Sequence, residues 1–418
     1  MCPPLRLLIP LFIAGGSLFS PPHGQAATLT ADLDPFITLP GAYGLKPDDL
    51  ESLYEQGSWN RNPYFKWLTE DQSRAIFQRK EAANLTVHLT MLGGTVPVEE
   101  LIVDFKGGKF VGITVSIFNR GDGGEISRDD FEERFRMMGS HLGKQLAVRP
   151  TKRDAKPTQG LLTSGYVWIS ARGKAVLEHN ELPNPNSPIE FLRMRLAQRD
   201  AGGAYEAATH TRAGATVRLS ELPRNVLRKP NGSVFIDAIP MVDQGAKGYC
   251  VVASVQRLFE YYGIPADMHQ LAQIAGSDPN EGTSSLAINR ELGAIDHLFK
   301  TRFECLAVRH TTGLVELVDD RYVGDSIPPD DFHKMIRKSI DDGIPLLWGL
   351  ELGRFPEEPS ISMQTGGGHM RMIIGYNEQE GRVIFSDSWG AGHEFKTMAA
   401  NDAYRATSGL FLLKPTVR

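Results

Sequence analysis

The residues best suited to chemistry lie on one short stretch, P-M-V-D-Q-G-A-K-G-Y-C, which contains Gln244 on a glycine-rich turn and ends at Cys250. After the cysteine, apolar residues recur at helical spacing: Val251, Val255, Leu258, Phe259 and Tyr262. Cys250 is therefore expected at a helix N-terminus, where unsatisfied backbone N–H groups and the helix dipole favour the thiolate. Because the thiolate is the reactive form of cysteine, the stretch predicts a nucleophile.

This stretch resembles the active-site turn of the papain-like cysteine peptidases, in which a Gln and a Gly precede a Cys that opens a buried helix. The form Q-G-x-x-G-Y-C-V-V-A-S, with its aromatic residue before the cysteine, is similar to the bacterial double-glycine-peptidase-like (bacteriocin-processing-like) branch. The resemblance covers residues 235–413 and leaves the first half of the chain unassigned. It implies a helical lobe carrying the Cys, an antiparallel sheet lobe carrying a His, and a cleft between them.

The same resemblance implies a His and an Asp or Asn further along the chain. The segment G-G-G-H-M-R-M-I-I-G-Y-N carries His369 into an apolar strand, and V-I-F-S-D-S-W-G places Asp387 at the end of another. In the family's pattern the Cys attacks the amide, the His holds the ion pair and transfers protons, and the Asp orients the imidazole. Gln244 and the backbone N–H of Cys250 would form the oxyanion hole. Papain has Asn at the place of Asp387, whereas Asp occurs in the double-glycine-like branch.

Each of these residues taken singly has a plainer explanation. His369 is compatible with an ordinary strand histidine, and Asp387 with a turn at a strand end. Trp389 suits either the core or an aromatic shield over the hydrogen bond between that His and Asp. The order Gln, Cys, His, Asp, closed by D-S-W-G, favours the catalytic interpretation of the set.

The predicted function is therefore an exported thiol peptidase that acts on a peptide or protein substrate, without a cofactor or a metal ion. Two alternatives stay open: an acyl transferase or amidase on the same fold, and a catalytically inactive binding protein on a peptidase fold. The formal net charge of -5, with 41% hydrophobic and 23% charged residues, gives no basic footprint for nucleic acid. The sequence does not indicate the oligomeric state.

The N-terminus predicts export to the periplasm or the medium. Arg6, the apolar run from Leu7 to Phe19 and the small residues up to Ala27 match the three regions of a secretory signal peptide over residues 1–26. A retained N-terminal anchor is the alternative; after cleavage no integral membrane segment is expected. Two cysteines then remain, Cys250 and Cys305, for which one disulfide is the rival interpretation to a nucleophile and a buried strand cysteine.

The 418-residue chain is predicted to hold two α+β units. Residues 27–200 form a small α+β domain of unassigned role, with period-two strands, a helix that begins at Ser127 and a helix opened by Ser187 and Pro188. Residues 201–233, rich in Gly, Ala, Thr and Arg, are expected to be a linker, and residues 234–418 the papain-like two-lobed catalytic domain. The first domain is interpreted as a cover over the cleft, a substrate-docking module or a spacer.

Overall fold

The structure is a computed structural model that describes residues 27–54, 64–82, 84–155, 162–210, 214–244, 249–275, 290, 293–311, 313–319, 322–360 and 367–417. The expected signal peptide, residues 1–26, lies outside these ranges. Among the residues that are described, none of the helices combines the length and the apolar character needed to cross a membrane. The fold is α+β, with large antiparallel sheets.

The first half of the chain is organised around an eight-stranded antiparallel sheet. Its strands, in spatial order, are β2 (Phe65–Trp67), β3 (Arg74–Gln78), β7 (Glu100–Lys106), β8 (Lys109–Asn119), β12 (Phe191–Ala197), β11 (Gly173–Asn180), β10 (Thr163–Ser170) and β9 (Thr151–Arg153). A four-stranded sheet lies beside it, with β1 (Ala27–Asp32) parallel to β5 (Leu85–Met91), which also pairs with β4 (Lys80–Ala82) and β6 (Val96–Val98). The helical elements are η1 (Asp34–Phe36), η2 (Gly41–Gly44), α1 (Pro47–Tyr54), α2 (Arg120–Gly123) and α3 (Arg128–Leu146).

Local chemistry explains several of these elements. The K-G-G-K segment joins β7 to β8, and both of its glycines have positive φ angles, 56° at Gly107 and 70° at Gly108, as a tight hairpin turn requires. Helix α3 begins where the Ser127 hydroxyl accepts a hydrogen bond from the backbone N–H of Asp130 at 3.1 Å. The helix packs its buried face against β10 and β11.

The helix expected after Ser187 and Pro188 is wrong, because this stretch forms strand β12. Its sequence F-L-R-M-R-L-A alternates, but both faces are buried. Leu192, Met194 and Leu196 face the apolar core of the first half, while Arg193 and Arg195 are buried on the opposite face. The arginines hid the strand period, since charged residues in a helix are normally assigned to solvent.

The second half is built on a ten-stranded sheet together with helices. The strands on its main path are β13 (Val226–Arg228), β14 (Ser233–Ile236), β19 (Gly368–Asn377), β18 (Leu346–Glu351), β22 (Thr407–Pro415), β15 (Thr301–His310), β16 (Gly313–Asp319) and β17 (Tyr322–Ser326). Strand β20 (Arg382–Ser386) pairs with β19 and with β21 (Lys396–Ala399). The helical elements are α5 (Cys250–Tyr261), α6 (Met268–Ala275), η4 (Asp296–Phe299), α8 (Pro329–Asp341) and α9 (Ala400–Ala406).

The stretch expected to be a linker, residues 201–233, has many exposed residues over its described part, but it also contains regular elements and several buried side chains. It contains α4 (Ala204–Ala207) and η3 (Leu219–Asn225), and it supplies the edge strand β13. Tyr205 is buried against the first half, whereas Leu222 is buried in the core of the second. Small residues such as Ala and Gly are compatible both with close packing and with an exposed linker, so composition alone did not distinguish these two possibilities.

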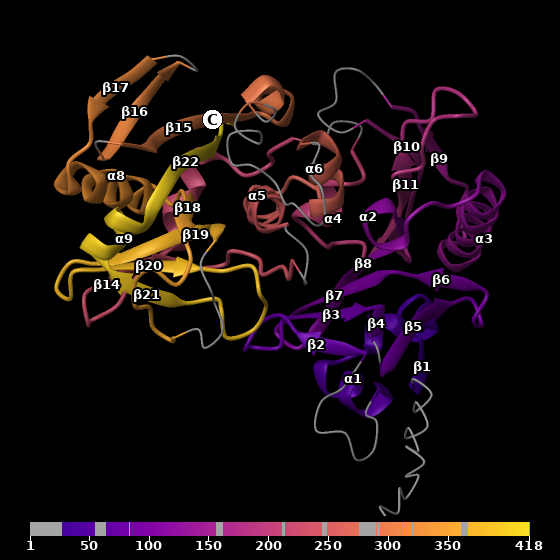
Figure 1. The fold of residues 1–418 in the computed structure, drawn as a ribbon. Helices are drawn as coiled ribbons and strands as arrows, with labels where there is room; N and C mark the ends of the chain where they lie inside the picture. The colour runs from indigo at the N-terminus through magenta and orange to yellow at the C-terminus, as the bar shows by residue number, and fades with distance from the viewer. Residues whose placement is uncertain are drawn as a thin grey trace, which may run out of the picture.

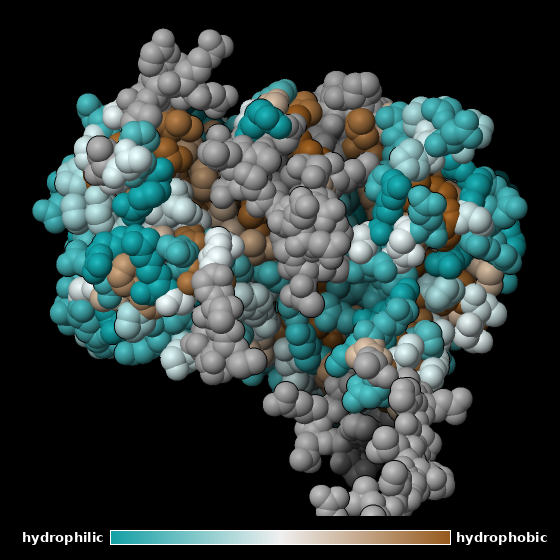
Figure 2. All heavy atoms as spheres, viewed as in Figure 1, coloured by the Kyte–Doolittle hydropathy of each residue, from teal (hydrophilic) through white to brown (hydrophobic). Residues whose placement is uncertain are grey.

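Buried apolar side chains form two large clusters, one with members between Ala31 and Leu196 and one with members between Ala215 and Leu413. Helices α5 and α6 lie between the two main sheets (Figure 1). On the face shown in Figure 2 most of the described surface is hydrophilic, with apolar residues in separate small patches. The contact between the halves includes several ion pairs.

Glu178 on β11 is the centre of a buried ion cluster at this contact. Its carboxylate accepts hydrogen bonds from Arg153, from Arg193 at 2.5 Å and from Arg195 at 2.8 Å. Arg193 also pairs with Asp267, and Arg195 donates to the carbonyl of Pro265 at 3.0 Å, both just before α6. The cluster therefore joins the sheet of the first half to the helices of the second.

We predict that Glu178→Gln destabilises the protein at neutral pH by about 3–5 kcal/mol, the usual cost of breaking a buried ion pair. Burial raises the pKa of Glu178, but the three arginines outweigh it and hold the pKa well below its usual value. A carboxyl with a depressed pKa contributes stability above its unfolded pKa of about 4.3 and loses it as the pH falls through the folded value. The deficit should therefore be complete at pH 7 and shrink in strong acid.

Urea unfolding midpoints at several pH values measure this effect. Glu181→Gln is the matched control, because Glu181 is exposed just after the end of β11 and its change should leave the midpoint unaltered. Equal midpoints for Glu178→Gln and the wild type at pH 7 would contradict the prediction.

Candidate active site

Cys250 is the first residue of α5, as the sequence predicted. The glycine-rich turn before it, residues 245–248, lies outside the described residues. Most of α5 is buried, and its Ser254 hydroxyl donates to the carbonyl of Met370 on β19 at 3.4 Å. The helix therefore packs directly on the strand that carries His369, which brings the thiol to the histidine.

His369 and Asp387 come together because their strands are neighbours. His369 lies near the start of β19, and Asp387 directly follows β20, which pairs with β19 in antiparallel register. The imidazole Nε2 and the Asp387 Oδ1 are 2.8 Å apart, and both residues are buried. On its other side the ring hydrogen-bonds to the thiol of Cys250. Since Nε2 faces the carboxylate, Nδ1 is the nitrogen on the thiol side.

The charges of the site favour a thiolate facing an imidazolium. Burial raises the pKa of the Cys250 thiol, but the hydrogen bond and the charge of His369 bring the pKa below its usual value. Burial lowers the pKa of His369, but its hydrogen bonds to Asp387 and Cys250 raise the pKa by more. The net result is a pKa of about 9. The pKa of Asp387 is likewise lowered, because the histidine and Arg371 outweigh its burial. Both shifts therefore favour the pair of thiolate and imidazolium over the neutral pair.

Gln244 lies on a loop beside the one that carries Asp387. Its backbone N–H donates to the carbonyl of Ser388 at 2.9 Å, and its side-chain Oε1 accepts from the Ser388 hydroxyl at 2.7 Å. Asp243, one residue earlier, forms a β-bridge with Trp389. These contacts orient the amide with its acceptor end on Ser388, so its Nε2 donor is at the opposite end. The structure thus joins the Gln244 and Asp387 loops.

Arg371 is a residue of the site that sequence reasoning missed. It is fully buried two positions after His369 on the same face of β19, and its Nε donates to the Asp387 Oδ2 at 2.7 Å. Its other nitrogens bind Glu357, which also pairs with the buried Lys396 at 2.6 Å. An arginine inside an otherwise apolar strand is the sequence signal that could have indicated a buried carboxylate partner.

Arg257 on α5 was also missed, and it links three parts of the site. Its guanidinium donates to the carbonyl of Pro240 at 2.8 Å, to the carbonyl of Asp387 at 2.9 Å and to the hydroxyl of Ser386 at 2.6 Å. Burial lowers the pKa of Arg257 to about 10, which still leaves it charged at neutral pH. One side chain thus fixes the nucleophile helix to both loops.

Trp389 lies against the catalytic histidine candidate. Its ring stacks on the His369 imidazole with centroids 4.6 Å apart and planes 20° from parallel. Of the two interpretations open for this residue, the aromatic shield over the bond between His369 and Asp387 fits the position. Because His369 and Asp387 are both buried, water has restricted access to their hydrogen bond.

The disulfide interpretation is wrong: Cys250 and Cys305 are both free thiols. Cys305 lies on β15, where burial raises its pKa to about 11. The pKa of Cys250 is shifted in the opposite direction. The two thiols therefore differ in reactivity in the sense expected for one nucleophile and one structural cysteine.

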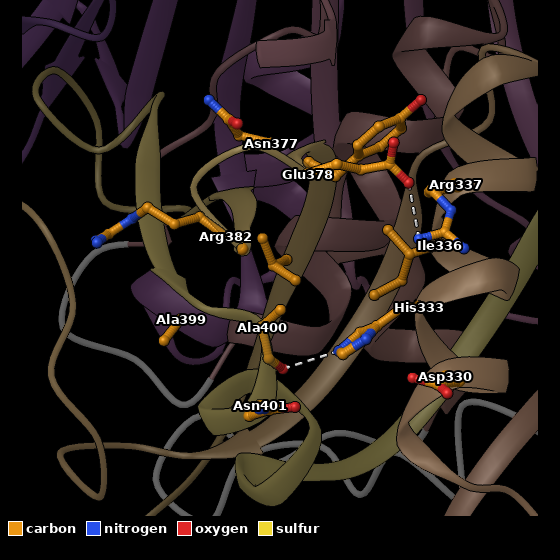
Figure 3. A pocket seen from close by; sticks show the side chains of 13 residues that line it. Asp330, His333, Ile336, Arg337, Asn377, Glu378, Arg382, Ala399, Ala400 and Asn401 are labelled. Carbon is orange, nitrogen blue, oxygen red and sulfur yellow. Dashed lines mark hydrogen bonds and ion pairs between the residues drawn. The ribbon is translucent and has the colours of Figure 1, made fainter. Parts of the chain in front are cut away.

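A hollow at the far end of β19 is separate from these residues (Figure 3). It lies between α8 and the β19–β20 turn, about 25 Å along the strand from His369 at the usual strand rise. Its side chains pair among themselves, His333 with the carbonyl of Ala400 at 3.1 Å and Arg337 with Glu378 at 2.9 Å. This hollow does not contribute to the site around Cys250.

A comparison with protein families covers most of the second half of the chain. Residues 236–410 match the model of the Peptidase_C39 like family. No curated protein matches the sequence. Among solved structures, Xylellain, a cysteine protease from Xylella fastidiosa, is 13% identical, with a TM-score of 0.27, over 49% of this chain and 92% of that one.

We predict a bell-shaped dependence of activity on pH from these shifts. Activity should rise as Cys250 ionises, at a pH below its ordinary range, and should fall near pH 9 as His369 loses its proton. Asp387→Asn removes a negative charge that raises the pKa of the histidine and leaves a weaker, neutral acceptor in its place, so the alkaline limb should move to lower pH. Profiles of kcat/KM for both proteins measure this, and an unmoved alkaline limb in the variant would refute it.

Proposed function

Since the second half of this chain is a cysteine peptidase domain of the Peptidase_C39-like type, we propose that it hydrolyses peptide bonds through a Cys250–His369–Asp387 triad. One observation carries the proposal: a single buried imidazole that is hydrogen-bonded to a carboxylate on one side and to a thiol on the other. The direction of the pKa shifts gives the nucleophile and the proton donor the charge states that amide hydrolysis needs.

In the acylation step, the Cys250 sulfur forms a bond to the substrate carbonyl carbon, and the carbonyl oxygen becomes an anion. We assign Gln244 Nε2 and the backbone N–H of Cys250 as donors to that oxygen. His369 then gives its proton to the amide nitrogen, the carbon–nitrogen bond breaks, and the amine leaves. The enzyme is left as a thioester with a neutral imidazole.

Deacylation uses the same imidazole in the opposite sense. His369 takes a proton from water, the hydroxide adds to the thioester carbonyl, and collapse of the intermediate breaks the carbon–sulfur bond. The products are a carboxylic acid and the thiolate facing an imidazolium. Asp387 keeps the ring in one tautomer and one orientation throughout both steps.

We also propose how the two lobes and the first domain are arranged around this site. We assign α5, α6 and η4 to a helical lobe and the strands from β15 onward to a sheet lobe, with residues 27–200 as a preceding α+β domain. Cys250 and His369 stand on different assigned lobes and meet where α5 packs on β19. We further propose that residues 1–26 are a cleaved signal peptide and that the mature protein is periplasmic or secreted. N-terminal sequencing of the exported protein, with Ala27 as the expected first residue, tests this.

Cys250→Ala is expected to abolish hydrolysis of a short fluorogenic peptide while leaving the melting temperature close to that of the wild type, because it removes one sulfur at a helix start. Cys305→Ala is the matched control and should retain activity. Iodoacetamide at pH 7 should label Cys250 before Cys305 in the wild type, as peptide mapping can show. Preferential labelling of Cys305, or full activity in Cys250→Ala, would remove the cysteine from its proposed role.

Gln244→Ala is expected to lower kcat by about 10²- to 10³-fold with little change in KM, because an oxyanion donor acts mainly on the transition state. The exposed Gln379→Ala serves as its control and should be neutral. A steady-state comparison of the two variants on one peptide decides the point. An unchanged kcat in Gln244→Ala would exclude this residue from the oxyanion hole.

A further inference from the structure

The first half of the chain contacts the residue next to Gln244. Lys66 on β2, an edge strand of the eight-stranded sheet, forms an ion pair with the carboxylate of Asp243. The lysine side chain is 51% exposed, whereas that of Asp243 is only 4% exposed. The aspartate belongs to the loop that holds Gln244 and bridges Trp389. A cation from the first half therefore holds the loop that carries the proposed oxyanion donor.

Further contacts bring the same region of the first half against both site loops. Leu68, Ile76 and Ile102 form a small apolar cluster with Met241 of the Gln244 loop. The backbone N–H of Glu70 donates to the carboxylate of Glu394 at 2.9 Å, close to the loop that follows Asp387. The segment after β2 thus contacts the Gln244 loop and the loop that follows Asp387. Arg257 of α5 binds the same two loops.

A second contact reaches the residue before Cys250. The hydroxyl of Tyr249 approaches Gly121 of α2 so closely that a Cβ atom there would lie 2.7 Å from it. Tyr249 is buried, and its ring packs edge-on against His269. The backbone N–H of Cys250, the other proposed oxyanion donor, directly follows this tyrosine. Both donors are therefore preceded in sequence by a residue that the first half contacts.

We propose that the first half of the chain is a permanent part of the active site, and that Lys66 is a positioning residue that holds Asp243 and thereby places Gln244 for transition-state binding. The inference rests on the proposed function, since it concerns the oxyanion hole of that reaction. A shift of about 1 Å in a group that stabilises the transition state can cost 10²-fold in rate. Loss of the Lys66 contact removes the cation that pairs with Asp243. Arg257, the apolar cluster around Met241 and the contacts with Ser388 and Trp389 would still hold the loop, so the expected change is a small displacement of Gln244.

This role differs from the cover, docking module or spacer expected from the sequence. A removable cover would leave the catalytic groups intact on removal. Here the ionic contacts at Asp243, Glu260 and Asp267 are distributed along the whole segment from the Gln244 loop to α6. The first half therefore supports the nucleophile helix and the Gln244 loop from behind, and its loss lowers activity instead of releasing it.

The test uses the full mature chain and one short fluorogenic peptide. Lys66→Met should lower kcat by about tenfold or more with KM changed less than about twofold, and Lys66→Arg should restore most of the rate because it keeps the charge. Alkylation of Cys250 by iodoacetamide should be unchanged, because that reaction forms no oxyanion and needs only the ion pair with His369. The exposed Lys109→Met, in the β7–β8 turn, is the matched control and should match the wild type in both assays.

A double-variant cycle separates positioning from a general structural effect. In the Gln244→Ala background, Lys66→Met should add less than about a twofold loss, since the group that it positions is already gone. Independent, multiplying losses would overturn the proposal. If Gln244→Ala lowers kcat but Lys66→Met does not, only this inference falls; if Gln244→Ala has no effect, the proposed oxyanion hole falls with it.

A further variant keeps the test decisive if Lys66→Met unfolds. Lys66→Met combined with Asp243→Asn removes both charges together, so no buried anion loses its cation. This protein should melt like the wild type and still show the lower kcat, because the contact that fixes the loop is missing. A wild-type kcat in the folded double variant would overturn the proposal.

Discussion

The arrangement of the site depends on one buried carboxylate. Asp387 is fully buried, and an isolated ionised carboxylate in such a place is strongly destabilised. It stays ionised because His369, Arg371 and the backbone N–H of Ser388 all donate to it. Two of these donors stand two residues apart on β19, so the alternation of a single strand delivers both to the same carboxylate. The strand pairing of β19 with β20 is thus the structural requirement for the charge state of the imidazole.

The charges alternate outward from the thiol. A Cys250 thiolate faces the His369 imidazolium, which faces Asp387, followed by Arg371, Glu357 and Lys396. Each ion therefore lies between neighbours of opposite sign, which offsets the cost of removing it from water. An apolar residue in place of Arg371 would leave the buried carboxylate of Asp387 with fewer donors. Arg371, Glu357 and Lys396 thus contribute to the electrostatics of the proposed triad.

Sequence patterns indicated the proposed catalytic groups more readily than the side chains that support them. Gln244, Cys250, His369 and Asp387 were found because each stands in a local motif with its own turn, helix or strand signal, and the structure brings all of them together. Arg257, Arg371 and Lys66 were not found, because the meaning of a charged residue depends on a partner that lies far away in sequence. Strand β12 was misassigned for the same reason, since its arginines are buried by a part of the chain that follows much later.

Ion pairs at the contact between the two halves restrict how the halves can move relative to each other. Charge-assisted hydrogen bonds add preferred directions and distances to such a contact, which apolar packing alone does not. The pairs at Asp243, Glu260 and Asp267 lie at the Gln244 loop, at the end of α5 and at the start of α6. They therefore fix both ends of the nucleophile helix region relative to the sheet of the first half. The proposed oxyanion donors and the thiol would need to keep a common geometry, and ion pairs across this surface suit that proposed role better than a flexible tether would.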